Sequence, residues 1–259
     1  MSKSVGIGLD IGSGSRVGAP APASPFGDFS VWLDFSDVDQ VFTDAALTTP
    51  VTADGDPVRG VADKSGNGRK FTMPGGYDPL LWRPALMGCE LYRHDALFPR
   101  LQSSGWNVGA VVGSGTVGTI FLVGRTFDTT DSALALSSEG YTSLQYDPVN
   151  ATAIAGVWNG ASADNATITG TASNTGFHIV MLRLGGGTIK VGLDNLADSA
   201  LVSLATTGMD GVSLLQPLTT SYGLMFHALY ASILVYPTTL SEAACMFNAA
   251  WAAGRWGIL

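Results

Sequence analysis

The stretch that decides the fold is FHIVMLRLGGGTIKVGLD, residues 177–194. Two β-prone runs flank three consecutive glycines, and glycine supplies the positive φ angles that a tight hairpin turn needs. In the second run, apolar side chains alternate with Lys190 and Asp194. Because successive side chains of a strand point to opposite faces, this stretch predicts a β-hairpin with one face buried.

The chain on either side of the hairpin continues the pattern, with short apolar runs separated by clusters of glycine, asparagine, aspartate and proline. This spacing is typical of an all-β sandwich or barrel, and 259 residues is an ordinary length for one such domain. The further strands that we expect lie at 29–35, 108–113, 118–127, 133–138, 142–147, 153–160 and 230–237.

One segment near the C-terminus, residues 240–257, predicts a helix. Ser241 is placed to cap the first turn, Glu242 suits the positive end of the helix dipole, and the alanines give the body high helix propensity. Gly254 indicates the C-terminal end. Four residues share one face by helical spacing, and we expect that face to dock on the sandwich. They are Met246, Phe247, Ala250 and Trp251.

The start of the chain differs from the rest. Residues 1–18 are rich in glycine and serine, and the run APAPASP at 19–25 favours an extended, polyproline-like backbone. The glycine-rich turn imitates the phosphate turn of a sugar kinase, but the α/β chain that such an ATPase needs does not follow. We therefore divide the chain into an arm, 1–25, and a β-sandwich domain, 26–259. The arm residues expected to contact neighbouring protein are Val5, Ile7, Leu9, Ile11, Pro20, Pro22 and Pro25.

Composition excludes several classes of partner. A net charge of −8 without a basic run argues against nucleic acid. No apolar run approaches the roughly 20 residues that cross a bilayer, and the opening does not fit a signal peptide, so we expect a cytoplasmically made chain without membrane insertion. Only 13% of residues are charged, which suggests a surface that meets other protein. Cys89 and Cys245 match no metal spacing and are expected to be buried thiols.

No catalytic motif is recognisable, so we expect no enzymatic activity. The run GSGTVG at 113–118 satisfies a dinucleotide fingerprint, but a β-prone run follows where a helix must begin. No nucleophile elbow occurs, and the compact carboxylate cluster of sandwich-fold glucanases is missing. The glutamates, Glu90, Glu139 and Glu242, are far apart in sequence.

Other polar residues have structural interpretations. His178 and His227 lie in or beside apolar strands, where a hydrogen-bonded structural imidazole is expected. Asp54 and Asp56 lie two residues apart in a loop, a pattern that also occurs in calcium sites, but the loop lacks the spacing of an EF-hand. We expect no cofactor, and calcium at these two aspartates is the alternative.

Three segments together resemble a known family. They are VWLDFSDVDQVFTDAALTTPVTADGDPVRGVADKSGNGRKFTMP at 31–74, the hairpin with its preceding glycine at 176–194, and YASILVYPTTLSEAACMFNAAWAAGRWG at 230–257. The chain resembles tailed-bacteriophage virion structural proteins with a concanavalin A-like (laminin G-like) jelly-roll domain. The resemblance implies a jelly-roll sandwich of two antiparallel sheets with one C-terminal helix, preceded by an extended N-terminal arm.

The same resemblance implies a function. The chain would be a structural component of a phage or phage-like virion, assembled in the bacterial host cytoplasm. Its arm would dock into other virion proteins of the head (capsid) or tail, and the sandwich would form homo-oligomers in a symmetric assembly. Ser232, Asn195 and Pro237 depart from the family pattern, so no particular ligand site is carried over.

We also consider binding of cell-surface polysaccharide, because sugars stack on exposed aromatic rings. The candidate contacts are Trp82, Trp106 and Trp158, which fall in or near predicted loops. For each of them the alternative is a place in the core, where large aromatic side chains dominate packing. Two other functions stay open: a polysaccharide-degrading hydrolase or lyase on the same fold, and a ligand-free capsid decoration protein.

Overall fold

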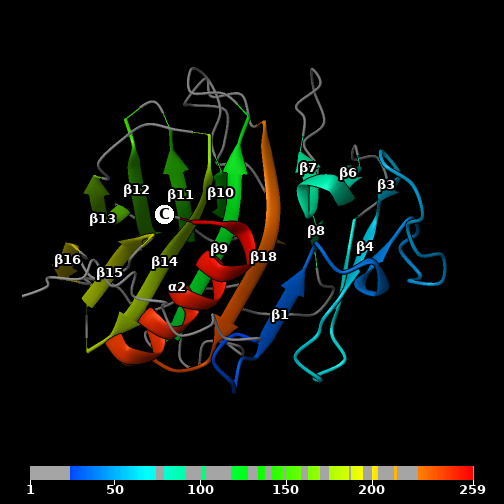
Figure 1. Ribbon diagram of the computed structural model, residues 1–259. Coiled ribbons are helices and arrows are strands. Elements are labelled where there is room, and N and C mark those ends of the chain that lie inside the picture. Colours follow the sequence, from blue (N-terminus) through cyan, green and yellow to red (C-terminus); the bar gives the residue numbers. More distant parts are fainter. Residues whose placement is uncertain are drawn as a thin grey trace, which may run out of the picture.

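Figure 1 shows the computed structural model, a set of β-sheets with one long helix on the outside. The structure describes residues 24–73, 79–91, 101–102, 118–127, 134–137, 142–148, 150–158, 163–169, 175–186, 188–194, 200–203, 213–214 and 227–258. Every strand pairing among these residues is antiparallel, which confirms the predicted all-β class.

The largest sheet has nine strands. They are β1 (Val31–Asp34), β3 (Pro57–Val58), β6 (Leu80–Arg83), β7 (Gly88–Leu91), β9 (Gly118–Thr126), β14 (Phe177–Gly185), β15 (Thr188–Leu193), β16 (Ala200–Ser203) and β18 (Ala228–Tyr236). Their order is β16-β15-β14-β9-β18-β7-β6-β3, and β1 also pairs with β18. A register shift between Tyr230 and Ser232 separates the part of β18 that pairs with β7 from the part that pairs with β1.

The predicted hairpin at 177–194 is confirmed. Strands β14 and β15 pair along their length and close on Gly185 and Thr188. At the turn, Gly186 has a φ of 60°, a conformation that favours glycine. On β15 the side chains of Ile189 and Val191 are buried in the main core, as the alternation predicts.

Two smaller sheets complete the β-structure. One has four strands: β10 (Leu134–Ser137), β11 (Thr142–Asp147), β12 (Thr152–Trp158) and β13 (Ala163–Thr169). The other has five: β2 (Val41–Phe42), β4 (Gly60–Ala62), β5 (Lys70–Thr72), β8 (Leu101–Gln102) and β17 (Ser213–Leu214). The 3-10 helices η1 (Val38–Gln40) and η2 (Pro84–Leu86) lie between short strands.

The resemblance predicted two sheets, whereas the structure has three that share one main core. The four-stranded sheet packs across this core from β14 and β15. The five-stranded sheet closes the same core beside it, on the right of Figure 1. Strands β2, β4 and β5 are only two or three residues long and are separated by turns rich in glycine and aspartate, and β4 pairs with both β2 and β5.

The predicted helix is α2 (Glu242–Trp256). Ser241 caps it as predicted, because its Oγ accepts a hydrogen bond of 3.3 Å from the Ala244 N–H. The helix ends at Gly257, whose φ of 69° closes the last turn, and not at Gly254.

The predicted docking face of α2 is wrong. Met246 and Phe247 are 42% and 40% exposed, Ala250 is exposed, and Trp251 alone of the four predicted residues is buried. The buried residues are Ala244, Cys245, Asn248, Ala249, Trp251, Ala252 and Trp256. Helix packing distance depends on the side chains at the contact, and this mostly small set lets α2 lie close to the sheet.

The nine-stranded sheet separates two apolar clusters. Helix α2 packs on the face of this sheet turned away from the main core (Figure 1), and the second cluster lies between that face and the helix. We call this face of the sheet the outer face and the opposite one the inner face. Among the described residues, no helix is both long enough and apolar enough to span a bilayer.

Candidate functional site

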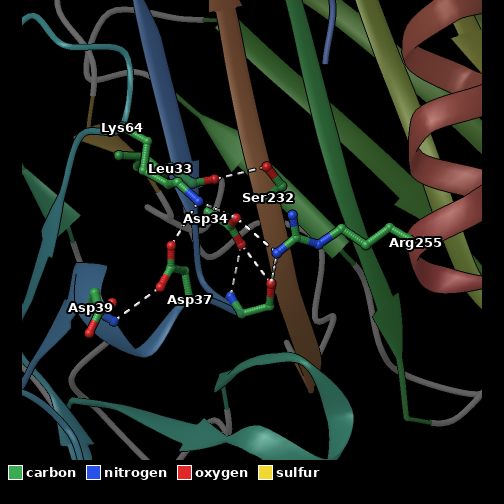
Figure 2. Close-up of polar contacts among 8 residues, drawn as sticks. Leu33, Asp34, Asp37, Asp39, Lys64, Ser232 and Arg255 are labelled. Atoms are coloured by element: carbon green, nitrogen blue, oxygen red, sulfur yellow. Dashed lines mark hydrogen bonds and ion pairs between the residues drawn. The ribbon is translucent and has the colours of Figure 1, made fainter. Parts of the chain in front are cut away.

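A group of charged side chains lies where β1, α2 and the loop after β4 meet (Figure 2). Asp34, the last residue of β1, is fully buried. Its Oδ2 lies 3.1 Å from Lys64 Nζ and 3.0 Å from Arg255 Nη2. Its Oδ1 accepts hydrogen bonds from the N–H and the hydroxyl of Ser36, at 3.2 and 2.6 Å. A buried carboxylate requires such partners, and here both oxygens are used within the protein.

Lys64 is held from several sides. Its Nζ lies 2.7 Å from Asp37 Oδ2 and 4.4 Å from the centroid of the Trp32 ring. Burial alone would lower the pKa of Lys64, but the hydrogen bond to Asp37 and the nearby charge of Asp34 raise it above its ordinary value. Burial would likewise raise the pKa of Asp37, and the hydrogen bond from Lys64 outweighs it and lowers that pKa. Two carboxylates thus balance the two cations of the cluster.

The loop with sequence DKSGNGR fastens the beginning of β1. Asp63 accepts a hydrogen bond of 2.9 Å from the Trp32 N–H. Three side chains of the loop donate to the carbonyl oxygen of Ser30, namely Ser65, Asn67 and Arg69. The motif residues that carry the family resemblance therefore hold the first strand in place, which is a structural task.

The first residue of the sandwich domain, which follows the arm, is also fixed to α2 and β18. The Phe26 N–H donates to Asn248 Oδ1 at 2.8 Å, and its carbonyl accepts from the Tyr236 hydroxyl at 2.8 Å. Of the candidate arm residues, Pro25 is described and is buried. The others, Val5, Ile7, Leu9, Ile11, Pro20 and Pro22, lie outside the described residues.

The three candidate tryptophans are placed differently. Trp82 is 7% exposed and belongs to the main core, so its ring faces are not open to a sugar. The alternative of a core position therefore holds for this residue. Trp106 and the side chain of Trp158, at the end of β12, lie outside the described part of the structure.

The candidate calcium ligands bind protein groups. Asp56 Oδ2 accepts hydrogen bonds from the N–H groups of Thr52 and Ala53, at 2.7 and 2.8 Å. Asp54 Oδ2 lies 3.1 Å from Arg83 Nη1. Within the described ranges, no group of three or more His, Cys, Asp or Glu side chains is placed to hold a metal ion.

A row of polar and aromatic side chains crosses the outer face of the large sheet beyond α2. Along β9, alternate residues such as Leu122 enter the main core, so Arg125 faces outward. Arg125 pairs across the sheet with Phe177 of β14 and with Leu229 of β18, and Leu229 pairs with Glu90 of β7. We call the row the outer-face strip and define it as Phe177, Arg125, Phe127, His227, Glu90 and Arg83.

Glu90 organises one half of the strip. Its Oε1 lies 2.9 Å from His227 Nε2, and its Oε2 lies 2.5 Å from Arg83 Nε. Burial would raise the pKa of Glu90, but the hydrogen bonds with Arg83 and His227 outweigh it and lower the pKa below its ordinary value of 4.5. Glu90 is therefore ionised at neutral pH with both oxygens engaged. This state suits the positioning of its neighbours and not general acid catalysis.

Aromatic rings organise the other half. The imidazole of His227 stacks on Phe127 with centroids 4.3 Å apart and an interplanar angle of 21°. The Cζ atom of Arg125 lies 5.6 Å from the centroid of Phe127 and 5.8 Å from that of Phe177. These flat apolar surfaces beside charged groups form a combination typical of sites that bind small polar ligands.

The remaining predicted polar residues have structural partners. On the inner face, His178 is 3% exposed, and its Nδ1 lies 3.0 Å from Asp194 Oδ2. Both histidines predicted to be structural are thus hydrogen-bonded. Cys89 and Cys245 are free and buried, as predicted, and burial raises the pKa of both thiols.

The outer-face strip was not predicted from the sequence. One signal was present, because Arg125 interrupts the apolar run GTIFLVGRTF, where a cation is unexpected in a central strand. No local pattern brings Glu90 to His227, which lies 137 residues away. That contact follows only from the pairing of β7 with β18.

Comparison with known proteins supports the fold. No protein-family model and no curated protein sequence matches the chain. Among solved structures, the binding domain of botulinum neurotoxin DC in complex with SialylT matches with a TM-score of 0.57 and 10% identity, covering 83% of this chain and 52% of that one. This similarity confirms a jelly-roll sandwich of the kind found in binding domains.

Two further structures agree. A botulinum neurotoxin type C structure, whose description states that cell entry depends on interaction with two ganglioside molecules, matches with a TM-score of 0.56 and 14% identity, over 73% of this chain and 48% of that one. The Trypanosoma rangeli sialidase in complex with 2,3-difluorosialic acid matches with a TM-score of 0.56 and 12% identity, over 90% and 34%. This chain therefore spans about half or less of each of these proteins.

Proposed function

We propose that this chain is a non-enzymatic structural component of a phage or phage-like particle. The sandwich is displayed outward and binds host-surface glycan, and the arm, residues 1–25, docks into head or tail protein. The particle assembles in the cytoplasm of the bacterial host. Symmetric repetition of the chain then raises the avidity of individually weak glycan contacts.

The outer-face strip is the observation that supports glycan binding. Aromatic rings receive the apolar faces of sugars, and ionised side chains hold their hydroxyl groups. The strip offers both kinds of group, on a fold similar to that of botulinum neurotoxin type C, whose description states an interaction with gangliosides. Its position on the opposite side of the sheet from the main core leaves the packing of that core independent of the ligand.

The test is binding of the full-length chain to an array of bacterial surface polysaccharides. We expect binding that Phe127→Ala weakens and that Phe247→Ala leaves unchanged. Phe247 is the matched control because it is an exposed ring on α2, outside the strip. Absence of binding to any glycan, or equal loss in both variants, contradicts glycan recognition at the strip.

Particle docking by the arm has its own test. Pro25 is buried and Phe26 is bonded to α2 and β18, so a deletion of residues 1–23 spares these contacts. The truncated chain should keep its thermal stability and lose incorporation into particles when it is supplied in place of the full chain. Incorporation at the normal level overturns the role of the arm.

The competing function is polysaccharide degradation. The histidine–carboxylate pairs His227–Glu90 and His178–Asp194 are the observation that favours it, and a sialidase shares the fold. Release of reducing sugar or unsaturated product by the purified chain, abolished by Glu90→Gln or Asp194→Asn, would establish an enzyme. We expect no release, because Glu90 is ionised and fully bonded and His178 is buried.

A further inference from the structure

Arg125 is a cation on the outer face of β9 without an anionic partner among the residues that the structure describes. It is half-buried, and its Nε is buried without a hydrogen-bond acceptor. Among the described residues, no carboxylate lies within ion-pair distance of its guanidinium. A buried donor left without an acceptor is costly, so an acceptor brought by a ligand is favoured at this position.

Two other arginines, unlike Arg125, form ion pairs with carboxylates. In the same strip, Arg83 is neutralised by Glu90 and Asp54. At the end of α2, Arg255 is neutralised by Asp34. Within the described structure, the strip therefore has one arginine paired with carboxylates, Arg83, and one without a carboxylate partner, Arg125.

The surroundings of Arg125 limit what can bind there. Its guanidinium carbon lies 5.6 Å from the ring centroid of Phe127 and 5.8 Å from that of Phe177. Both rings attract the cation by cation–π interaction and place apolar surface beside it. A ligand that reaches the guanidinium must therefore combine an anionic group with an apolar face of similar size to a ring.

We propose that Arg125 binds the carboxylate of an acidic sugar, with the sugar ring resting against Phe127 or Phe177. The inference rests on the proposed glycan-binding function and names the class of sugar. A guanidinium matches a carboxylate in a planar, two-bond geometry. The net charge of −8 disfavours polyanions such as nucleic acid, whereas one carboxylate needs only one uncompensated cation.

The test uses the full-length chain and two matched pairs of probes. They are 3′-sialyllactose against lactose, and trigalacturonic acid against its methyl ester. Isothermal titration should show that the chain binds at least one acidic probe at least about tenfold more tightly than its neutral partner. The pair that responds identifies a sialic or a uronic acid as the source of the carboxylate.

Variants assign the preference to the residue. Arg125→Gln should abolish the preference for the acidic probe, and Arg125→Lys should keep part of it because the charge remains while the planar fork is lost. Lys70→Gln makes the same change of charge on an exposed side chain of β5 and should have no effect. Unchanged melting temperatures show that the variants are folded.

The outcomes separate the two proposals. Binding of neutral and acidic probes with equal affinity, or an unchanged preference in Arg125→Gln, overturns the assignment of Arg125 and leaves glycan binding standing. If the chain binds neither these probes nor any polysaccharide of the array, both proposals fail.

Discussion

Asp34 is the residue at which two distant parts of the chain meet β1. It receives Lys64 from the loop after β4, Arg255 from the end of α2, and Ser36 from the turn that follows β1. Two of these contacts join segments that are far apart in sequence. A fully buried charge with such partners is expensive to disturb, because removing it strands the cations it neutralises.

The substitution Asp34→Asn should therefore destabilise the protein by about 3 kcal/mol in urea unfolding. The amide has the same shape but leaves Lys64 and Arg255 without the charge between them. Asp39→Asn is the control, since Asp39 is an exposed carboxylate of the same segment, and it should change stability by less than about 0.5 kcal/mol. Equal losses of stability in the two variants would show that the charge cluster around Asp34 does not stabilise the protein.

Single residues were predictable from the sequence where their environment depends on nearby residues, and unpredictable where it depends on residues far away in the chain. The burial of Cys89 and Cys245 and the structural state of His178 follow from local sequence, and the structure confirms them. Trp82 could not be placed, because a tryptophan near a turn packs inward or outward according to strands elsewhere in the chain. The link between Glu90 and His227 was equally inaccessible, because it depends on long-range strand pairing.

Among the elements, α2 shows the limit of helical patterning. Its existence and its Ser241 cap were predictable from propensity and spacing. Its docking face was not, since the helical spacing of Met246, Phe247, Ala250 and Trp251 indicated a different face. The buried face contains Asn248 because its side chain bonds Phe26 and Tyr236, two partners that no helical wheel includes.

The observed face of α2 gives a direct test. Trp251→Ala should cost about 4 kcal/mol, because Trp251 is 1% exposed and its ring packs against those of Trp32 and Trp256. Phe247→Ala should cost about 1 kcal/mol or less, because Phe247 is 40% exposed and touches mainly Phe26. Chemical denaturation measures both. If Phe247→Ala lowered the free energy of unfolding more than Trp251→Ala, the docking face predicted from the sequence would be correct.

In the whole molecule, the fold was predictable and the outer-face strip was not. Hairpin chemistry and period-2 patterning gave most long strands within a few residues, because these signals are local. The division of the second layer into two sheets depends on which short strands find partners, and this is decided by the complete fold. Within the family-like segment at 31–74, Asp63 and Ser65 hydrogen-bond the backbone at the start of β1, so this motif has a structural role.

The response of the whole molecule to acid follows from its carboxylates. The pKa values of Glu90 and Asp37 are lower in the folded protein than their ordinary values of 4.5 and 3.8, because hydrogen bonds from Arg83 and Lys64 outweigh the opposing effect of burial. The unfolded chain thus takes up protons at a higher pH than the folded chain does. Stability that is fully present at neutral pH should fall as the pH drops below about 4.5 and through the folded pKa values.

Thermal unfolding followed by circular dichroism between pH 7 and pH 3 measures this decline. Glu90→Gln should lower the melting temperature at pH 7 and show a smaller further decrease in acid, because the variant no longer has this carboxylate to protonate. Asp28→Asn is the control, since Asp28 is exposed and its φ of 63° suits asparagine, and its curve should run parallel to that of the unmodified chain. A Glu90→Gln curve that also runs parallel would mean that Glu90 contributes the same stability in both protonation states. Its bonds to Arg83 and His227 would then not depend on its charge.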